Sequence, residues 1–262
     1  MPTTLGAHSP RLAAVRALLT KRGRREQGCF SVAGLTMLEE ALSAQRVPEA
    51  LYVTAAALDA LGPPTATLAD RIFVVSERAL AGLTDLETPP GLVAVHRGSL
   101  ENAEAILASG APTLVLADLS DPGNAGTLLR SAEIFGIKAA LLTERAVGPY
   151  NPKLVRATMG AIFRLRLGVG GGAELRAAAA GFGYAVVVAD RSGSPLPRFR
   201  FPRKPLIVIG NERHGPGDWL RHAEHCVAIP QGGRGQSLNA AVAGAIILYA
   251  FQQQCADTIG SS

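Results

Sequence analysis

One strand–loop–helix unit near the middle of the chain constrains the fold more than any other stretch. Residues 113–119 (TLVLADL) form a short, apolar, β-favouring run that is typical of a buried strand. The next residues, 121–124 (DPGN), are turn formers, and apolar side chains then recur at helical spacing up to Gly136. Ligands of open α/β sheets bind beyond the carboxyl ends of the strands, so Asn124 and Arg130 lie where a functional site is expected.

Strands and helices alternate along most of the chain. Short apolar runs predict strands at 30–32, 50–53, 72–75, 92–96, 113–119, 137–142, 163–169, 184–189, 206–209 and 226–229. Helical patterns lie at 9–21, 36–45, 55–60, 77–83, 121–136, 151–160, 174–180, 217–222 and 237–253. This alternation predicts an α/β protein with a mostly parallel sheet that is covered on both faces.

Two domains are expected. Residues 88–91 (TPPG) break the chain before the last strand of its first half. We therefore expect an N-terminal domain over residues 1–97, a linker over 98–110 and a C-terminal domain over 111–262.

Composition excludes several classes of protein. With 262 residues the chain can bury a sizeable core, and no segment reaches the roughly 18 uncharged apolar residues of a membrane helix. The N-terminus lacks a secretory pattern, and three widely spaced cysteines suit reduced thiols, so we expect a cytoplasmic protein. The irregular spacing of His214, His222, His225 and Cys226 favours surface histidines over a metal site.

Basic residues cluster in two places. The net charge is +5 and the sequence pI is about 9.4, which permits a polyanionic partner. The first cluster lies between Arg11 and Glu26 and contains Arg11, Arg16, Lys21, Arg22, Arg24 and Arg25. The second contains Arg198, Arg200, Arg203 and Lys204, with Phe199 and Phe201 between them. Both clusters suit phosphate binding, and the alternative for each is a solvated face.

Three polar loops follow strands in the C-terminal half. They are 121–130, then 210–212 (GNE), and then 229–239, where Ile-Pro precedes a glycine-rich stretch and Ser-Leu-Asn. Glycines let a ligand approach the backbone, and a helix start offers free N–H groups. Each loop alone is ordinary, because Ser237 and Asn239 would serve as helix caps. Their joint occurrence indicates one composite site.

Taken together, these motifs resemble those of the SpoU (TrmH-like) branch of the SPOUT RNA methyltransferases, in the family's order. The matching residues are Asn124 and Arg130 in the first motif, Gly210 to Glu212 in the second, and Ile229, Pro230 and Ser237 to Asn239 in the third. Residues 149–165 resemble a further run of the family, and residues 30–95 are similar to its substrate-binding domain. The chain departs from the family at Arg213, where glycine is common.

The resemblance implies a fold and an activity. It implies a knotted parallel-sheet (SPOUT, trefoil knot) catalytic domain preceded by a small α/β substrate-binding domain. It implies binding of S-adenosylmethionine (AdoMet) through Gly210, Ile229 and Leu238, a homodimer with the last long helix at its interface, and no metal. The implied reaction is methylation of a ribose 2'-hydroxyl in RNA, with ribosomal RNA favoured over transfer RNA.

Site residues follow from the same resemblance. The expected catalytic residues are Asn124, Arg130, Glu212, Ser237 and Asn239. Arg130 is expected to hold a substrate phosphate and stabilise the developing alkoxide, because a guanidinium hardly deprotonates in proteins. The residues expected to contact RNA are Arg156, Lys21, Arg22, Arg24 and Arg25.

Parts of the sequence are compatible with two other functions. Gly168, Gly170 and Ala173 spell G-x-G-x-x-A, with Asp190 about 20 residues further on, which is the pattern of an NAD-dependent oxidoreductase. That reading leaves the three methyltransferase motifs unexplained. The other alternative is a non-catalytic RNA-binding protein. It does not explain why five polar residues occur together in the three loops: Asn124, Arg130, Glu212, Ser237 and Asn239.

Overall fold

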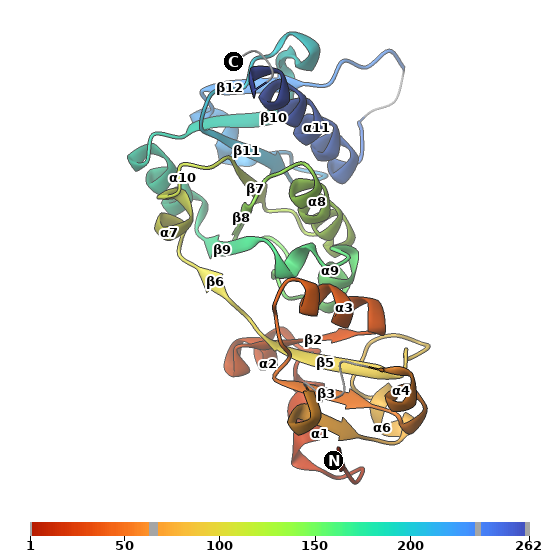
Figure 1. Cartoon of the computed structure of the whole chain (residues 1–262). Coiled ribbons are helices and arrows are strands. Elements are labelled where there is room, and N and C mark those ends of the chain that lie inside the picture. The colour runs from red at the N-terminus through yellow and green to blue at the C-terminus, as the bar shows by residue number, and fades with distance from the viewer. Residues whose placement is uncertain (1, 63–67, 234–236, 260–262) are drawn as a thin grey trace. The chain divides into compact units, whose positions relative to one another are not determined.

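The structure is a computed structural model that describes residues 2–62, 68–233 and 237–259. Contacts divide the chain into two compact units (Figure 1), of which the first comprises Met1–Gly98 and Tyr150–Phe163 and the second Ser99–Pro149 and Arg164–Ser262. The division differs from the expected segments in two places. Residues 150–163 pack with the N-terminal unit, and the expected linker supplies a strand and a helix to the second unit.

The N-terminal unit is built on a five-stranded mixed sheet in the order β1-β4-β3-β5-β2. The strands are β1 (Thr3–Thr4), β2 (Cys29–Ala33), β3 (Ala50–Val53), β4 (Ile72–Val74) and β5 (Leu92–Arg97). The helices are α1 (Pro10–Ala17), α2 (Lys21–Gln27), α3 (Leu35–Ser43), α4 (Ala55–Ala60), η1 (Ala69–Arg71), α6 (Glu77–Ala81), α9 (Pro152–Ala157) and η2 (Ala161–Phe163). Strand β5 pairs antiparallel with β2 and β3, while β4 pairs parallel with β1 and β3.

The basic residues Lys21, Arg22, Arg24 and Arg25 lie on a helix of their own, α2. The sequence predicts one helix over residues 9–21, but α1 ends at Ala17 and α2 begins after Thr20, whose hydroxyl accepts a hydrogen bond from the N–H of Gly23 at 3.0 Å. A Cβ at Gly23 would lie 2.1 Å from the carbonyl oxygen of Ala17, so only glycine lets the two helices approach this closely. Gly28 then ends α2 at a φ of 61°.

Aromatic stacking holds residues 150–163 in the N-terminal unit. The rings of Phe30 and Tyr150 stack with centroids 4.5 Å apart, and those of His96 and Phe163 lie 4.9 Å apart. The carbonyl of Phe163 also accepts a hydrogen bond from Nε of Arg46 at 3.3 Å. Burial lowers the pKa of His96 to about 4, so its imidazole is neutral at pH 7 and packs as an aromatic ring.

The second unit contains a seven-stranded sheet in which every pairing is parallel, which confirms the predicted sheet type. The order is β12-β10-β11-β7-β8-β9-β6. The strands are β6 (Leu100–Glu101), β7 (Thr113–Ala117), β8 (Ala139–Thr143), β9 (Arg166–Gly170), β10 (Ala185–Pro195), β11 (Pro205–Gly210) and β12 (His225–Ala228). The helices are α7 (Ala103–Leu107), α8 (Pro122–Ile134), α10 (Gly172–Gly181), η3 (Leu196–Arg198), η4 (Gly217–His222) and α11 (Ala240–Ile259).

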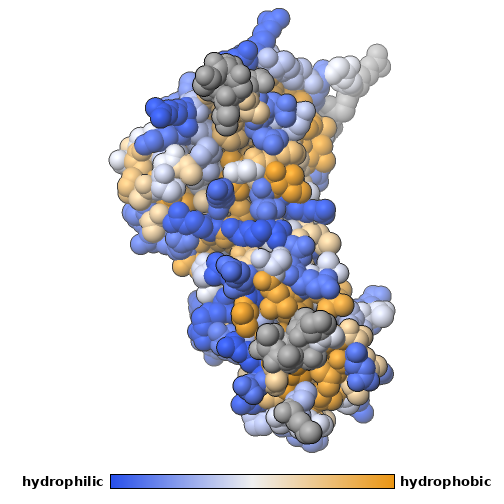
Figure 2. Space-filling view, viewed as in Figure 1, coloured by the Kyte–Doolittle hydropathy of each residue, from blue (hydrophilic) through white to orange (hydrophobic). Residues whose placement is uncertain are grey.

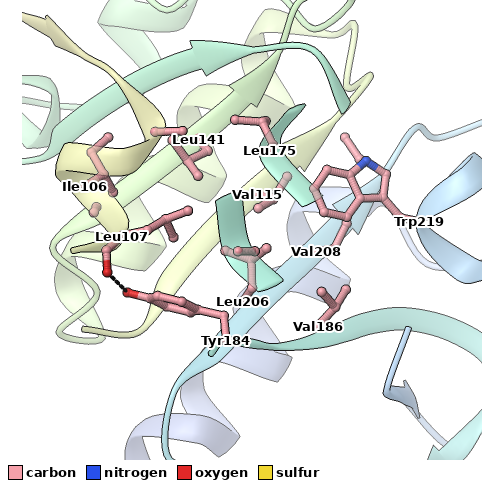
Figure 3. Close-up of a cluster of buried hydrophobic side chains, with 14 of the residues drawn as sticks. Ile106, Leu107, Val115, Leu141, Leu175, Tyr184, Val186, Leu206, Val208 and Trp219 are labelled. Carbon is pink, nitrogen blue, oxygen red and sulfur yellow. Dashed lines mark hydrogen bonds between the residues drawn. The ribbon is translucent and has the colours of Figure 1, made fainter. Parts of the chain in front are cut away.

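Helices cover both faces of this sheet, as Figure 1 shows. On one face α7 and α10 pack on alternate strand residues, among them Val115 and Val208, and the hydroxyl of Tyr184 donates to the carbonyl of Leu107 at 3.2 Å (Figure 3). On the other face α8 packs against α11. There a Cβ at Gly244 would lie 2.2 Å from the side chain of Leu128, so α11 sits close to α8.

The glycines of the G-x-G-x-x-A pattern have a packing explanation. Gly168 and Gly170 lie within β9, and a Cβ at Gly168 would lie 2.8 Å from the carbonyl oxygen of Glu101 in the paired strand β6. A Cβ at Gly170 would lie 2.9 Å from the side chain of Leu175 on α10. Close contacts with β6 and α10 therefore account for both glycines without a dinucleotide.

Candidate active site

The predicted loops meet at the carboxyl edge of the seven-stranded sheet. Strands β7 and β11 are neighbours, and their last residues, Ala117 and Gly210, are paired in register. The loop that leads to α8 and the loop that begins at Asn211 therefore start side by side. This is the edge at which parallel α/β sheets bind ligands.

A chain of hydrogen bonds joins three of the predicted catalytic residues. The amide nitrogen of Asn124 donates to Oε1 of Glu212 at 2.7 Å, and its amide oxygen accepts from Nδ2 of Asn239 at 2.9 Å. These residues come from α8, from the loop after β11 and from the residue before α11. Asn124 is thus the central member, since it uses both ends of its amide to link segments 88 and 115 residues away.

Helix caps fix the two asparagines. Oδ1 of Asp121 accepts from the N–H of Asn124 at 2.7 Å, which caps α8. Oδ1 of Asn239 accepts from the N–H groups of Ala241 and Val242 at 2.9 and 3.2 Å. The sequence placed the start of the long helix at Ser237, but the helix begins at Ala240, because the Asn239 side chain satisfies its first free N–H groups.

Arg130 remains free at the surface of α8. Its side chain is exposed and has no hydrogen bond or ion pair with any residue in the described part of the chain. Exposed guanidinium groups without a carboxylate partner can bind phosphate through two parallel N–H bonds. Among the described residues none supplies Arg130 with an anion, which suits a residue that binds substrate.

Sequence reasoning missed two residues that shape the site. Asp118 follows β7 with a φ of 54°, and its carbonyl accepts from Nδ2 of Asn211 at 2.8 Å. The hydroxyl of Thr143 accepts from the N–H of Asp118 at 2.7 Å and donates to its carboxylate at 2.6 Å. Oδ1 of Asn211 in turn accepts from the N–H groups of Arg213 and His214, which closes the turn that presents Glu212. The GNE motif already contained Asn211. Asp118 belongs to no motif, and its one signal in the sequence is that it directly follows a buried strand.

We expect substitutions of Asp118 to separate backbone from side-chain effects. Asp118→Gly keeps the positive φ and the backbone N–H bond to Thr143 and loses only the carboxylate bond, so the free energy of unfolding should fall by about 1 kcal/mol with near-normal turnover. Asp118→Val should cost about 1–2 kcal/mol more, because a β-branched residue does not tolerate this φ; the backbone should move, carry the carbonyl of residue 118 away from Asn211, and lower turnover. Urea unfolding and turnover rates measure the two effects. Equal turnover in both variants would show that this carbonyl does not position the turn.

A pocket of about 120 Å³ is lined by residues of β10 and β12, by the loop after β12 and by α11. Ile229 and Leu238, both predicted to bind the cofactor, line it together with Val227, Ala243 and Ile247. Apolar walls of this kind suit the flat adenine ring of AdoMet, so the residues present fit the cofactor. Ser237 also lines the pocket and is exposed, and it makes no contact with the asparagine–glutamate chain among the residues that are described.

Gly210 of the second loop has a different role, and part of the third loop lies outside the described residues. Gly210 does not line the pocket; a Cβ there would lie 2.3 Å from the backbone nitrogen of Pro216, so glycine allows the turn after β11 to close. The glycine-rich loop was predicted over residues 231–236, and residues 234–236 lie outside the described residues.

The predicted RNA-contacting arginines belong to the N-terminal unit, and most have partners there. Arg156 makes two hydrogen bonds to the carboxylate of Asp85, which lower the pKa of that carboxyl below its usual range. Arg24 donates to the carbonyl of Leu18 at 2.8 Å, and Arg22 pairs with Glu26 at 2.7 Å. Lys21 and Arg25 are exposed on α2 and have no hydrogen bond or ion pair within residues 2–62, 68–233 and 237–259.

Two further properties concern only the part of the chain that is described. Within it no three histidine, cysteine, aspartate or glutamate side chains form a group that could hold a metal ion. No helix in the same ranges has both the length and the apolar character to cross a membrane.

Comparison with solved structures identifies the class of protein. The AdoMet-bound rRNA methyltransferase from Sinorhizobium meliloti superposes with a TM-score of 0.85 and 25% identity, over 96% of this chain and 97% of that one. The fold is that of the SPOUT methyltransferases. The Sinorhizobium meliloti protein and the SpoU methyltransferase AviRb of Streptomyces viridochromogenes both hold AdoMet in their structures. The trefoil knot itself stays a prediction.

The particular family follows from the sequence. Residues 111–249 match the SpoU rRNA Methylase family, and residues 9–94 match the MRM3-like substrate binding domain. The chain belongs to the SpoU rRNA methylase family.

Curated relatives agree with this assignment. The 23S rRNA (guanosine(2553)-2'-O)-methyltransferase RlmP of Bacillus subtilis is 26% identical over 89% of this chain and 92% of that protein. Ribosomal RNA small subunit methyltransferase G 2 of Syntrophobacter fumaroxidans is 29% identical over 93% of this chain, which spans only 48% of that longer protein.

Proposed function

We propose that the protein transfers the methyl group of AdoMet to a ribose 2'-hydroxyl of ribosomal RNA. The observation that carries the proposal is the hydrogen-bonded chain of Asn124, Glu212 and Asn239 at the sheet edge, close in sequence to Arg130 on α8, which has no partner among the described residues. Relatives named as rRNA 2'-O-methyltransferases support the choice of substrate.

The residues suit an in-line displacement. When bound, AdoMet would supply a methyl group on a sulfonium: the carbon–sulfur bond breaks as the carbon–oxygen bond forms, S-adenosylhomocysteine leaves, and the hydroxyl proton passes to water. Alignment of the attacking oxygen with the methyl carbon and the sulfur can contribute about 7–11 kcal/mol. Asn124, Glu212 and Asn239 position the ribose through a rigid polar surface, and Ser237 adds a hydroxyl at the pocket. Arg130 binds the adjacent phosphate and stabilises the negative charge that develops on the 2'-oxygen.

The N-terminal unit serves as the substrate-binding domain, and the second unit holds the catalytic machinery. The match of residues 9–94 to a substrate binding domain supports this division. Because the proposed substrate is ribosomal RNA, we also propose that the protein acts in the cytoplasm. Arg156 is proposed as a weaker RNA contact than Lys21 and Arg25, because Asp85 already occupies its guanidinium.

A radiolabelled-methyl assay tests the function. Incorporation into unmodified ribosomal RNA but not transfer RNA is expected, and mapping of 2'-O-methyl groups in cells with and without the gene would locate the nucleotide. Labelling of transfer RNA alone would favour the transfer-RNA alternative. Binding of RNA without any labelling would favour a non-catalytic RNA-binding protein.

Neutralising the free cations of α2 should weaken RNA binding in a salt-dependent way. Lys21→Gln with Arg25→Gln removes two exposed charges, so the slope of log affinity against log salt should become shallower by about 1.4–1.8. Arg22→Gln is the matched control, because Glu26 already neutralises Arg22 and a smaller change is expected. Filter binding over a salt series measures the slope. An unchanged slope would mean that the run is a solvated surface.

We also propose that the protein is a homodimer joined through α11. Apolar side chains form a stripe on this helix, where Val242, Ile246 and Tyr249 are 48%, 38% and 51% exposed, and Ile134 at the end of α8 is 58% exposed. The ring of Phe135 contacts that of Tyr249 at 5.8 Å, which makes the patch continuous. Figure 2 shows apolar surface over this part of the second unit. Contiguous apolar patches of this kind mark interaction sites.

Ile246→Glu should convert the dimer to a monomer. The substitution places a charge in the centre of the apolar stripe, where the second copy would bury it without a partner. Sedimentation velocity should show loss of the larger species with the far-ultraviolet spectrum unchanged. Val47→Glu is a matched control, since Val47 is an exposed apolar residue of the N-terminal unit at 51%. A wild-type protein that sediments as a monomer would contradict the proposal.

A further inference from the structure

An irregularity in β10 brings an acidic side chain to the cofactor pocket. Along β12, Val227 is paired with Ala189 and again with Ser194, so residues 190–193 are extra and bulge from the ladder. Bulges of this kind often lie next to active sites, where they redirect side chains.

The bulge is held in one conformation. Oδ1 of Asp190 accepts from the N–H of Ser192 at 2.9 Å and from its hydroxyl at 2.6 Å. A Cβ at Gly193 would lie 2.4 Å from the carbonyl carbon of Cys226, so only glycine lets the returning chain lie against β12. The carboxylate of Asp190 is therefore fixed at one of its two oxygens.

The other oxygen of this carboxylate is available to a ligand. Asp190 lines the pocket of about 120 Å³ alongside Ile229, Leu238 and Ile247. No described residue donates a hydrogen bond to Oδ2 of Asp190. Arg191, Gln231 and Ser237 also line the pocket, and Asp190 itself is half-buried. A half-buried acceptor is stabilised when a ligand supplies the donor.

We infer that Asp190 recognises the ribose hydroxyls of the adenosine half of AdoMet. Vicinal hydroxyls offer two donors, and hydrogen bonds to a charged acceptor are the stronger kind. In this arrangement the adenine ring packs against the apolar side chains of the pocket, and the ribose hydroxyls donate to the carboxylate of Asp190. The inference rests on this pocket being the AdoMet site, and it adds a specificity-determining residue that none of the three motifs contains.

A binding cycle tests the inference on the full-length protein. Calorimetric titrations with S-adenosylhomocysteine and with its 2'-deoxy and 3'-deoxy forms would be made on the wild type and on Asp190→Asn. We expect Asp190→Asn to weaken S-adenosylhomocysteine by about tenfold or more. For at least one deoxy ligand we expect Asp190→Asn to lower the affinity less. The hydroxyl that Asp190 contacts is already absent from that ligand, so the effects of the substitution and of the missing hydroxyl do not add.

Other outcomes would overturn the assignment. An equal loss for all three ligands would show that Asp190 contacts a part of the cofactor other than the ribose hydroxyls, and no loss would leave Asp190 without a binding role. Asp218→Asn is the matched control, since Asp218 is an exposed carboxylate of the same unit that pairs with Arg221 and does not line the pocket. Ser192→Ala should give an intermediate loss, because the N–H of Ser192 still holds the carboxylate. If the wild type bound no S-adenosylhomocysteine, the proposed function would fail instead.

Discussion

Replacing Arg130 with lysine is expected to lower kcat for methyl transfer by about 100-fold and to leave the affinity for AdoMet unchanged. The guanidinium is exposed on α8 and has no partner in the described chain, so substrate is the anion that it is available to bind. A planar fork can hold a phosphate by two bonds and fix its orientation, whereas an ammonium acts as a point charge. Single-turnover rates at saturating RNA, together with calorimetry for AdoMet, separate the two quantities.

The pH dependence of the Arg130→Lys variant distinguishes orientation from proton abstraction. A guanidinium stays protonated across the working range, so a role in orientation predicts that the ratio of variant to wild-type rate is flat with pH. If residue 130 acted as a base, the lysine would deprotonate more easily than the arginine, and the ratio of variant to wild-type rate would increase as pH rises. Arg221→Lys, at an exposed arginine that pairs with Asp218, should change neither rate nor affinity.

Sequence patterns predicted the strands and helices of the second unit well, because neighbouring residues in the chain determine where these elements form. Apolar runs such as residues 113–117 form strands that are buried on both faces, and the turn formers at 121–124 begin α8 as expected. Motif order also placed Asn124, Glu212 and Asn239 in one site, and the structure brings their side chains into contact.

Long-range contacts account for what the sequence did not predict. Residues 150–163 follow β8 in the chain, yet Tyr150 stacks on Phe30, some 120 positions earlier, and no local pattern specifies that contact. The same packing gives Arg156 an ion-pair partner in Asp85, which sequence alone could not assign. The bulge at Asp190 has a similar origin, since it depends on how β10 pairs with β12.

Asn124→Asp is expected to lower kcat by about 100-fold at neutral pH, although the side chain keeps its shape. The new carboxylate still accepts from Nδ2 of Asn239, but it faces Oε1 of Glu212 at the distance of the former hydrogen bond, 2.7 Å in the wild type. Two carboxylates so close repel each other, and the turn that presents Glu212 should move away from α8. Methyl-transfer rates on the RNA substrate measure the loss.

The loss in Asn124→Asp should be relieved by acid, which identifies its cause. One shared proton restores a hydrogen bond between the two carboxyl groups, so the apparent pKa of the pair is raised. The repulsion is present above that pKa and disappears as pH falls through it, so the ratio of variant to wild-type rate should rise between about pH 8 and about pH 5.5. Asn124→Ala is the control, because it breaks both links without adding charge and should be slow at every pH. A pH-independent deficit in Asn124→Asp, equal to that of Asn124→Ala, would mean that Asn124 acts on the substrate directly and not by holding Glu212.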